Sequence, residues 1–376
     1  MKAGWQTKQL GDICDIYQPK TISFKEMTEH GKYPVFGANG IIGRYDKYNH
    51  EDPQLLVTCR GATCGSVNIS EPNSWITGNA MVVRPKSDEI ILPFLAYLFR
   101  GAIDISKVIT GAAQPQITRT NLAPTQISYP SSVQEQHHIV AILDEAFAGI
   151  ATATANAERN LNNARELFKS HLQSVFTCDE AGWQTKQLGD ICQTGSGGTP
   201  LKSTKEFYEG GTIPWIVSGE VSQGEVTSAK HFITKNGLEN SSARLFPKNT
   251  ILVAMYGATA GETGILRFEA STNQAVCGIL PNKYFVPEFL YYCMLSKKEE
   301  LISQAVGNAQ PNISQIKIRN TEVPIPPRPE QHRIVTILDS LSTTTNRMEA
   351  IYQQKHTALN ELKQSVLHQA FSGQLH

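Results

Sequence analysis

The sequence predicts a mixed α+β fold in which a globular domain followed by a long α-helix occurs twice, and two observations carry this prediction. The segment GWQTKQLGDIC stands at Gly4–Cys14 and recurs unchanged at Gly182–Cys192, an offset of 178 residues. Each copy leads through a stretch rich in Gly, Pro and β-branched residues to a long segment nearly free of Gly and Pro. An identity of this length indicates a tandem duplication, so one unit is used twice.

Weaker repeats follow in the same order in both halves. QEQHHIVAILD at Gln134–Asp144 is similar to PEQHRIVTILD at Pro329–Asp339, at an offset of 195. This offset exceeds the first by 17, which predicts about 17 extra residues in the second half, around His231–Asn249. Shorter echoes pair Leu56–Gly65 with Leu252–Gly261, Phe94–Arg100 with Phe289–Leu295, and Gly111–Ile117 with Gly307–Ile313.

The composition divides the chain into four segments. Residues 1–130 and 182–327 contain short apolar runs separated by Gly and Pro, which predicts two globular domains of strands and turns. Residues 131–181 and 328–376 predict two long helices, whose roughly 40 helical residues would each span about 60 Å. We expect these helices to pair as an antiparallel coiled coil that acts as a spacer; two separate helical hairpins are the alternative.

The coiled-coil prediction rests on apolar residues at alternating steps of three and four. In the second helix they are Ile334, Leu338, Leu341, Thr345, Met348, Tyr352, Lys355, Leu359, Leu362 and Val366, with two polar interruptions. In the first helix Ile139, Leu143, Ala146 and Ile150 follow these steps, and Leu161, Leu167, Leu172 and Phe176 come later, after a middle part rich in Ala, Thr and Asn.

Composition also excludes several classes of protein. The chain has 376 residues, 40% of them hydrophobic, which is enough for packed cores. No run of apolar residues is long enough to span a membrane and no apolar signal segment stands at the start, so we expect a cytoplasmic protein. Thirty-four basic and 34 acidic side chains cancel, and the four segments carry +2, −4, +1 and +1. These charges permit a nucleic-acid partner without demanding one.

No constellation of residues predicts catalysis or a resident cofactor. GSGGTP at Gly195–Pro200 lacks the Lys and Ser/Thr of a phosphate-binding loop, so we predict a turn there. Cys59 and Cys64 have no second Cys or His pair at metal-ligand spacing, so buried thiols are expected and no metal. The histidines at the helix starts have no nucleophile beside them and suit capping and partner contact. The chain is therefore predicted not to be an enzyme.

Repeated polar positions in predicted turns are the candidates for binding. QPQI at Gln114–Ile117 and QPNI at Gln310–Ile313 take the same place in the two halves and are followed by basic residues. Gln, Asn, Arg and Lys are the side chains that pair with adenine and guanine edges, although a single basic residue is more often a solvated surface residue. The candidates for DNA binding are Arg44, Lys47, Arg60, Gln114, Gln116 and Arg119 in the first half, and Lys202, Lys205, Lys230, Arg244, Lys248, Tyr256, Gln310, Asn312, Lys317 and Arg319 in the second.

With these residues in view, the chain resembles the specificity subunits of type I restriction–modification systems. The resemblance rests on the repeated GWQTKQLGDIC, on the two QEQHHIVAILD-like helix starts, and on two longer segments. These are GGTPLKSTKEFYEGGTIPWIVSGEV at Gly197–Val221 and ELKQSVLHQAFSGQL at Glu361–Leu375. The resemblance covers essentially the whole chain. The first domain departs from the pattern, because YPVFGANGIIGRY at Tyr33–Tyr45 lacks the GGTP opening, and its DNA-contacting loops are less defined for that reason.

The resemblance implies that each globular domain is a target recognition domain that reads one half of a bipartite, asymmetric site in double-stranded DNA. The helices would set the half-site spacing and dock two adenine methyltransferase subunits that hold S-adenosylmethionine. Restriction and motor subunits would bring ATP and magnesium, and no membrane partner is expected. The residues expected to contact the methyltransferase are Glu135, Gln136, Ile139, Glu330, Gln331 and Ile334.

Two alternatives stay open. The first is a duplicated protein-interaction scaffold whose helices dimerise and whose domains bind protein or glycan. The second is a specificity subunit of a related, fused methylase–nuclease system.

Overall fold

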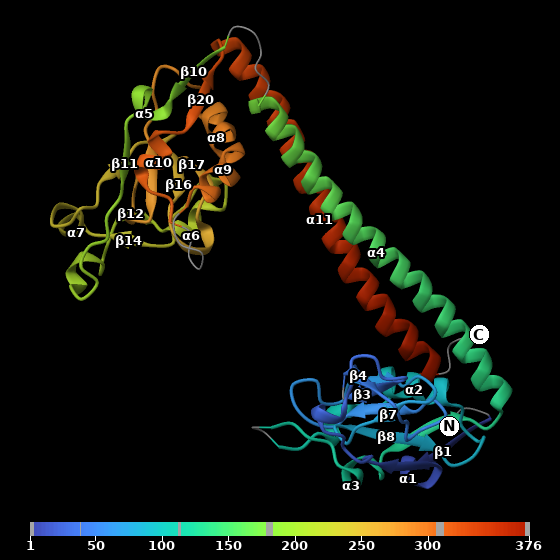
Figure 1. The fold of residues 1–376 in the computed structure, drawn as a ribbon. Coiled ribbons are helices and arrows are strands. Elements are labelled where there is room, and N and C mark those ends of the chain that lie inside the picture. Colours follow the sequence, from blue (N-terminus) through green and yellow to red (C-terminus); the bar gives the residue numbers. More distant parts are fainter. Residues whose placement is uncertain (1–3, 38, 112–113, 178–182, 306–311, 373–376) are drawn as a thin grey trace. The chain divides into compact units, whose positions relative to one another are not determined.

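The computed structural model describes residues 4–37, 39–111, 114–177, 183–305 and 312–372. The chain divides into two compact units, Met1–Arg159 with Tyr352–His376 (unit 1) and Asn160–Ile351 (unit 2). Each unit contains one strand-rich domain together with parts of the two long helices, which Figure 1 draws in green and red. Strands and helices alternate irregularly, so the fold is mixed α and β, as the sequence predicts.

The strand-rich domain of unit 1 is built on three small sheets. The largest is antiparallel, with the strand order β2-β8-β5-β6. Strand β5 reads Leu-Leu-Val-Thr and is buried at every position, because it lies between two other strands in the core. The strands are β1 (Trp5–Gln9), β2 (Cys14–Tyr17), β3 (Tyr33–Gly37), β4 (Gly40–Tyr45), β5 (Leu55–Thr58), β6 (Val67–Ile69), β7 (Trp75–Ile76), β8 (Ala80–Pro85) and β9 (Gln126–Pro130).

Short helices cover and connect these strands. Helix α2 carries a Pro in its first turn, where the missing amide hydrogen has no partner to lose, and packs Phe94, Leu95 and Leu98 into the core. The smaller sheets have the orders β4-β3-β7 and β1-β9. The helices are α1 (Leu10–Ile13), α2 (Leu92–Gly101) and α3 (Arg119–Leu122), with 3₁₀ turns η1 (Phe24–Glu26) and η2 (Ile105–Val108).

The strand-rich domain of unit 2 enlarges the same plan. Its sheets have the orders β11-β19-β16-β17-β13, β14-β12-β18-β15 and β10-β20. Figure 1 shows α8 beside β16 and β17, and its residues Phe289, Leu290 and Cys293 share a core with these strands. The strands are β10 (Gln184–Gln187), β11 (Thr194–Ser196), β12 (Ile213–Ile216), β13 (Glu225–Val226), β14 (Phe232–Ile233), β15 (Leu245–Phe246), β16 (Ile251–Ala254), β17 (Thr263–Leu266), β18 (Ala270–Thr272), β19 (Val276–Ile279) and β20 (Glu322–Ile325).

The helices of this domain are mostly short. They are α5 (Leu188–Ile191), α6 (Ser218–Val221), α7 (Lys235–Glu239), α8 (Pro287–Ser296), α9 (Lys298–Ser303) and α10 (Gln315–Arg319), with 3₁₀ turns η3 (Lys205–Phe207) and η4 (Gly257–Thr259). The duplication is visible in the sheets, because β11-β19-β16-β17 repeats the order of β2-β8-β5-β6 with the same chain positions. The extra residues around His231–Asn249 form β14, α7 and β15.

The two long helices, α4 (Val133–Thr177) and α11 (Arg328–Ser372), run antiparallel inside each unit. In unit 1 the start of α4 shares a core with the end of α11, through Leu143 and Leu367. In unit 2 the end of α4 shares a core with the start of α11, through Leu172 and Leu338. The predicted antiparallel pairing is confirmed.

Part of the predicted coiled-coil seam is wrong. Leu167 and Leu362 lie on the seam by their spacing, yet their exposed fractions are 59% and 48%. A straight helix repeats every 3.6 residues and drifts away from a strict heptad, so the apolar stripe leaves the interface at these positions. Polar contacts between the helices replace it, with Arg165 paired to Glu349 at 3.2 Å and His356 facing Glu158 at 3.8 Å.

Helix α4 contains one 18-residue window that is long and apolar enough, by composition alone, to cross a membrane, with a mean hydropathy of 1.3. A core helix of a globular protein passes the same test. Only 17% of that window is buried, and the α4 residues that pack in the core of unit 1 include Ile139, Val140 and Leu143.

The Gly-rich segment Gly195–Pro200 is not the turn that the sequence predicts. It begins in β11 and continues without a turn or bend, and its glycines lack positive φ angles. A Cβ on Gly197 would lie 2.1 Å from the carbonyl oxygen of Thr272, and one on Gly198 would lie 2.3 Å from the carbonyl carbon of Ser242. Glycine is required here because other backbone segments pass very close.

Candidate nucleic-acid interface

Two predicted turns of unit 1 that are distant in sequence lie against each other. Arg60, at the start of the GAT turn, forms an antiparallel backbone bridge with Gln116 of the QPQI segment. The amide of Ile117 donates to the carbonyl of Cys59 at 3.0 Å. Gly61 has a φ of +84°, a conformation that favours glycine and lets the chain turn back immediately after Arg60. We call this pairing the turn junction.

The turn junction of unit 1 borders a depression of about 370 Å³ that gathers three of the predicted residues. Arg60, Gln116 and Arg119 all line it with exposed side chains. Tyr17 and Gln18 line it too, although the sequence did not indicate them. Two guanidinium groups and two amides in one depression are the groups that pair with base edges and phosphates.

Unit 2 repeats the turn junction with different side chains. Tyr256 forms the bridge with Asn312, in the place of the Arg–Gln bridge of unit 1. The amide of Ile313 donates to the carbonyl of Met255 at 2.8 Å, so the backbone frame is the same. Tyr256 and Asn312 are exposed, whereas Gln310 lies outside the described residues.

Helix α10 follows the unit 2 junction directly. Gln315 takes the place that Arg119 has in unit 1, and its amide donates to the hydroxyl of Thr194 at 2.8 Å. Lys317 is half-buried, and Arg319 is exposed with a long hydrogen bond of 3.4 Å to a backbone carbonyl. The sequence did not indicate Gln315 because nothing in its spacing marks it; its equivalence to Arg119 appears only when the starts of α3 and α10 are compared.

A second concave surface of unit 2, which we call the lysine cavity, has a volume of about 930 Å³. Lys202, Lys205 and Lys230 line it, and all three side chains are exposed. Lys205 lies 3.9 Å from Glu209, a surface pair that neutralises it only weakly. The cavity therefore presents an excess of positive charge to solvent.

The wall of the lysine cavity contains aromatic side chains that are held by hydrogen bonds and ring contacts. The indole of Trp215 donates to the carbonyl of Gly198 at 3.0 Å and packs edge-on against His231, with ring centres 6.4 Å apart. The hydroxyl of Thr199 donates to the side chain of Gln274. Other polar and aromatic groups of the cavity that the sequence did not indicate are Asn273, Phe232 and Tyr208. The only signal for the amide pair Asn273–Gln274 is its position between two buried strands.

Several predicted residues stand apart from both surfaces. Arg44 donates to the carbonyls of Gly31 at 2.6 Å and Lys32 at 2.8 Å, so its guanidinium ties two backbone segments together. Arg244 lies over the ring of Phe246, 5.0 Å from its centre. The remaining candidates, Lys47, Lys248 and Gln114, are exposed.

The prediction that Gln136 contacts a partner is wrong, because the side chain is fully buried in unit 1. Its carbonyl oxygen accepts from the amide of Ile91 at 3.0 Å. Its amide nitrogen donates to the carbonyls of Glu89 and Pro130, both at 2.9 Å. All of its strong hydrogen-bonding groups are engaged inside the domain, so it fastens the start of α4 to the strand-rich domain.

Gln331 repeats this arrangement in unit 2 and is equally unavailable. It accepts from the amide of Val286 at 2.7 Å and donates to the carbonyls of Tyr284 and Pro326, both at 2.9 Å. The predictions for Ile139 and Ile334 are wrong for the same reason, since each is only 4% exposed and packs in its unit's core. Of the predicted partner contacts, Glu135 is exposed and Glu330 is half-buried.

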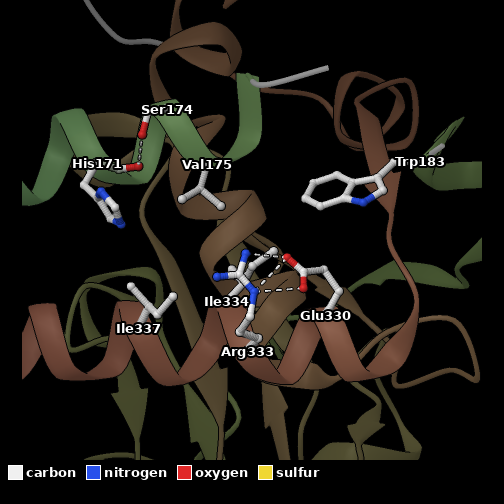
Figure 2. Close-up of a pocket in the computed structure, with 8 residues that line it drawn as sticks. All are labelled: His171, Ser174, Val175, Trp183, Glu330, Arg333, Ile334 and Ile337. Carbon is white, nitrogen blue, oxygen red and sulfur yellow. Dashed lines mark hydrogen bonds and ion pairs between the residues drawn. The ribbon is translucent and has the colours of Figure 1, made fainter. Parts of the chain in front are cut away.

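Glu330 lines a small pocket of about 190 Å³ in unit 2, shown in Figure 2. Arg333 donates to both oxygens of Glu330, at 2.6 and 2.9 Å, and this pairing lowers the pKa of the Glu330 carboxyl. In Figure 2 this pair lies on α11, His171 and Ser174 come from α4, and Trp183 stands at one side. The pocket thus combines a polar pair with the apolar side chains of Val175, Ile334 and Ile337.

The structure offers no candidate metal centre in the residues that it describes. No group of three or more His, Cys, Asp or Glu side chains converges among them. The six described cysteines are free thiols, with Cys59 buried and Cys64 partly buried. Burial raises the pKa values of Cys14 and Cys277 to about 12, so these thiols stay protonated and unreactive.

Comparison with known proteins places this arrangement in a family. The type I restriction modification DNA specificity domain matches residues 2–161 and again residues 180–355. The specificity subunit of the Escherichia coli type I restriction enzymes EcoR124I and EcoR124II is 29% identical over 360 residues, which cover 90% of this chain and 86% of that protein.

Two solved structures share the fold along the whole chain. A chain from a type I R-M system, solved to explain complex assembly and conformational transition, has a TM-score of 0.79 at 19% identity and covers 100% of this chain and 99% of its own. The HsdS subunit of Thermoanaerobacter tengcongensis has a TM-score of 0.63 at 18% identity, with coverage of 100% and 98%. Because the domain matches account for most of the sequence and occur twice, the chain belongs to the family of type I restriction–modification specificity subunits.

Proposed function

We propose that this chain is the DNA-reading subunit of a type I restriction–modification complex, and that residues 1–130 and 182–327 each read one half of a bipartite, asymmetric site. The observation that carries the proposal is the duplicated turn junction. Its backbone bridge is the same in both units, yet it presents Arg60 and Gln116 in one and Tyr256 and Asn312 in the other. The same backbone arrangement with two different sets of base-pairing side chains suits two domains that recognise different DNA sequences.

The lysine cavity supports the same proposal for the second domain. Lysine ammonium groups contact phosphates and fix a protein's register on the duplex, while amides such as those of Asn273 and Gln274 can pair with base edges. The first domain has no GGTP opening and reads its half-site with the depression around Arg60, Gln116 and Arg119.

The rest of the complex is proposed from the family. The long helices dock two adenine methyltransferase subunits and set the distance between half-sites. Their contacts use exposed helix residues such as Glu135 together with the Glu330 pocket, because the buried glutamines cannot reach a partner. S-adenosylmethionine, ATP and magnesium belong to the partner subunits, this chain performs no catalysis, and the complex is cytoplasmic.

Methylome sequencing of a host strain with and without this gene tests the proposal. Deletion is expected to remove one split N6-methyladenine motif while the methyltransferase gene stays intact. Replacing residues 182–327 by the corresponding domain of another family member is expected to change only one half of that motif. If every motif persists after deletion, the chain does not read DNA and the protein-interaction scaffold becomes the better explanation.

Binding measurements separate the remaining alternatives. The methyltransferase complex is expected to bind plasmid DNA in a salt-dependent manner only when this chain is present. Salt-independent binding, or binding without the chain, would contradict the DNA-reading role. A neighbouring gene for a fused methylase–nuclease would assign the chain to that related system.

A further inference from the structure

A cavity of about 410 Å³ in unit 1, apart from the turn junction, carries two basic side chains. Arg100 at the end of α2 and Lys363 on α11 line it together with the ring of Phe147 from α4. The Lys363 ammonium lies 5.5 Å from the centre of the Phe147 ring, and the Arg100 guanidinium lies 5.6 Å from that of Tyr97. Within the described chain, neither cation forms an ion pair with a carboxylate.

Two acidic side chains of the same unit are already engaged elsewhere. Asp104 pairs with Lys107 at 3.3 Å and accepts from the hydroxyl of Ser106 at 2.5 Å. Asp144 accepts from the phenol of Tyr97 at 2.5 Å. The cavity lining itself contains no acidic residue. Its positive charge is therefore not balanced from within the cavity.

The duplicated half shows what fills the same place in unit 2. At the offset of 195 residues, Leu295 stands for Arg100 and Phe168 stands for Lys363, and both pack against the unit 2 core. After the repeated GAT turn, Glu262 stands where unit 1 has Ser66. Apolar side chains and a carboxylate thus stand in unit 2 where unit 1 has the two cations and Ser66.

Charges around the unit 2 position are balanced. Lys298 pairs with Glu262 at 2.6 Å, and Lys169, which stands for Gln364 of the unit 1 cavity, pairs with Glu299 at 2.5 Å. In unit 2 the cations near this position pair with carboxylates of the same unit, whereas Arg100 and Lys363 of unit 1 have no such carboxylate among the described residues. The missing components in unit 1 are a carboxylate and an apolar side chain.

We propose that the unit 1 cavity binds an acidic segment of a partner protein, with a carboxylate between Arg100 and Lys363 and an apolar side chain against Phe147. A DNA backbone would meet the two cations but would gain nothing from the apolar wall that Val67, Phe147 and Leu367 provide. The site occurs in one unit only, so the segment binds once per chain, in contrast to partners that follow the duplication and bind twice. The proposal does not depend on the DNA-reading role.

Fluorescence anisotropy with the full chain and a labelled Glu-Glu-Phe-Glu-Glu peptide tests the site. Saturation is expected at one peptide per chain. The double variant Arg100→Leu/Lys363→Phe, which copies the unit 2 residues, is expected to weaken binding at least tenfold. Lys169→Gln, which removes a cation at the matched position of unit 2, serves as the control and is expected to leave binding unchanged.

A second variant keeps both cations and adds a carboxylate to the lining of the cavity. Ser66→Glu places a carboxylate where unit 2 has Glu262 and is expected to weaken peptide binding to a similar degree while the melting temperature is unchanged or higher. The proposal is overturned if both variants bind as the unmodified chain does, if two peptides bind per chain, or if a short duplex displaces the peptide with higher affinity than the unlabelled peptide. Methylation motifs read in the same strains report separately on the DNA-reading role.

Discussion

The turn junctions of the two units share one backbone arrangement but present different side chains. Both are held by the same backbone bridge between the GAT turn and the loop before the next short helix. The side chains on that bridge are Arg60 and Gln116 in unit 1 and Tyr256 and Asn312 in unit 2. Backbone hydrogen bonds do not depend on side-chain identity, so the junction can change what it presents without losing its shape.

The helix anchors show the opposite behaviour. Gln136 and Gln331 make the same set of three buried hydrogen bonds in the two units. Tyr97 donates to Asp144 at 2.5 Å, and Tyr292 donates to Asp339 at 2.7 Å, at the duplicated positions on α4 and α11. Here side chains themselves carry the contact, so the duplicated residues remain identical while the surface residues diverge.

Removing an anchor glutamine is expected to have the largest effect on stability. Gln331→Leu leaves one amide and two carbonyls of the backbone buried without partners, and each such group costs about 1–3 kcal/mol. We expect a loss on the order of 3 kcal/mol from the free energy of unfolding, measured by urea denaturation. Gln136→Leu should cost unit 1 a similar amount, with Glu135→Gln as the exposed control. A large loss in one unit and none in the other would break the equivalence of the anchors.

A smaller effect distinguishes two glycines of the Gly-rich segment. The Cβ of Gly197→Ala would lie 2.1 Å from a backbone oxygen of Thr272, which cannot move without shifting β18. We expect this variant to destabilise unit 2 by about 1–3 kcal/mol. In Gly195→Ala the obstructing atoms belong to the flexible end of Arg244, so a smaller loss is expected in the same denaturation experiment. Equal losses would show that close backbone packing is not the reason for these glycines.

The lysine cavity should affect DNA binding rather than stability. Lys230→Ala is expected to weaken binding of the assembled methyltransferase complex and to reduce the slope of log K against log salt by about 0.9, as for one lost phosphate contact. Lys235→Ala is the matched control, because Lys235 pairs with Glu239 at 3.6 Å on α7 and does not line the cavity. Identical salt slopes for both variants would remove the cavity from the interface.

The smallest expected effect is the pH dependence of the stability of unit 1. Glu89 accepts hydrogen bonds from Lys8, Tyr129 and Gln6, which lower the pKa of its carboxyl. A lowered pKa in the folded state stabilises the fold above the unfolded value of about 4.3, and this contribution disappears as the pH falls through the folded pKa. Glu89→Gln should lower the melting temperature at pH 7 and have little effect below that window. A melting difference that stays constant with pH would contradict an ionic contribution.

The sequence was most informative where residue type and position repeat. The exact recurrence of GWQTKQLGDIC and the weaker repeats at the helix starts and GAT turns predicted the tandem fold and the antiparallel helices. They also marked the polar segments that the structure brings together at the turn junctions. It failed for Gln136 and Gln331, because a polar residue beside charged ones on a helix suggests a surface. Only the carbonyls of distant loops reveal that these amides are buried.

The amino-acid sequence by itself determined that one unit is used twice, where the two copies diverge, and which turns carry polar side chains. These properties follow from local pattern and internal comparison. Tertiary structure decided which of those side chains share a surface. Lys202, Lys205 and Lys230 line one cavity, whereas Arg44 ties down backbone and Arg100 with Lys363 line a cavity that no local pattern indicates. The reason is that a surface is assembled from segments that are far apart in sequence, and only the packing of the core brings them together.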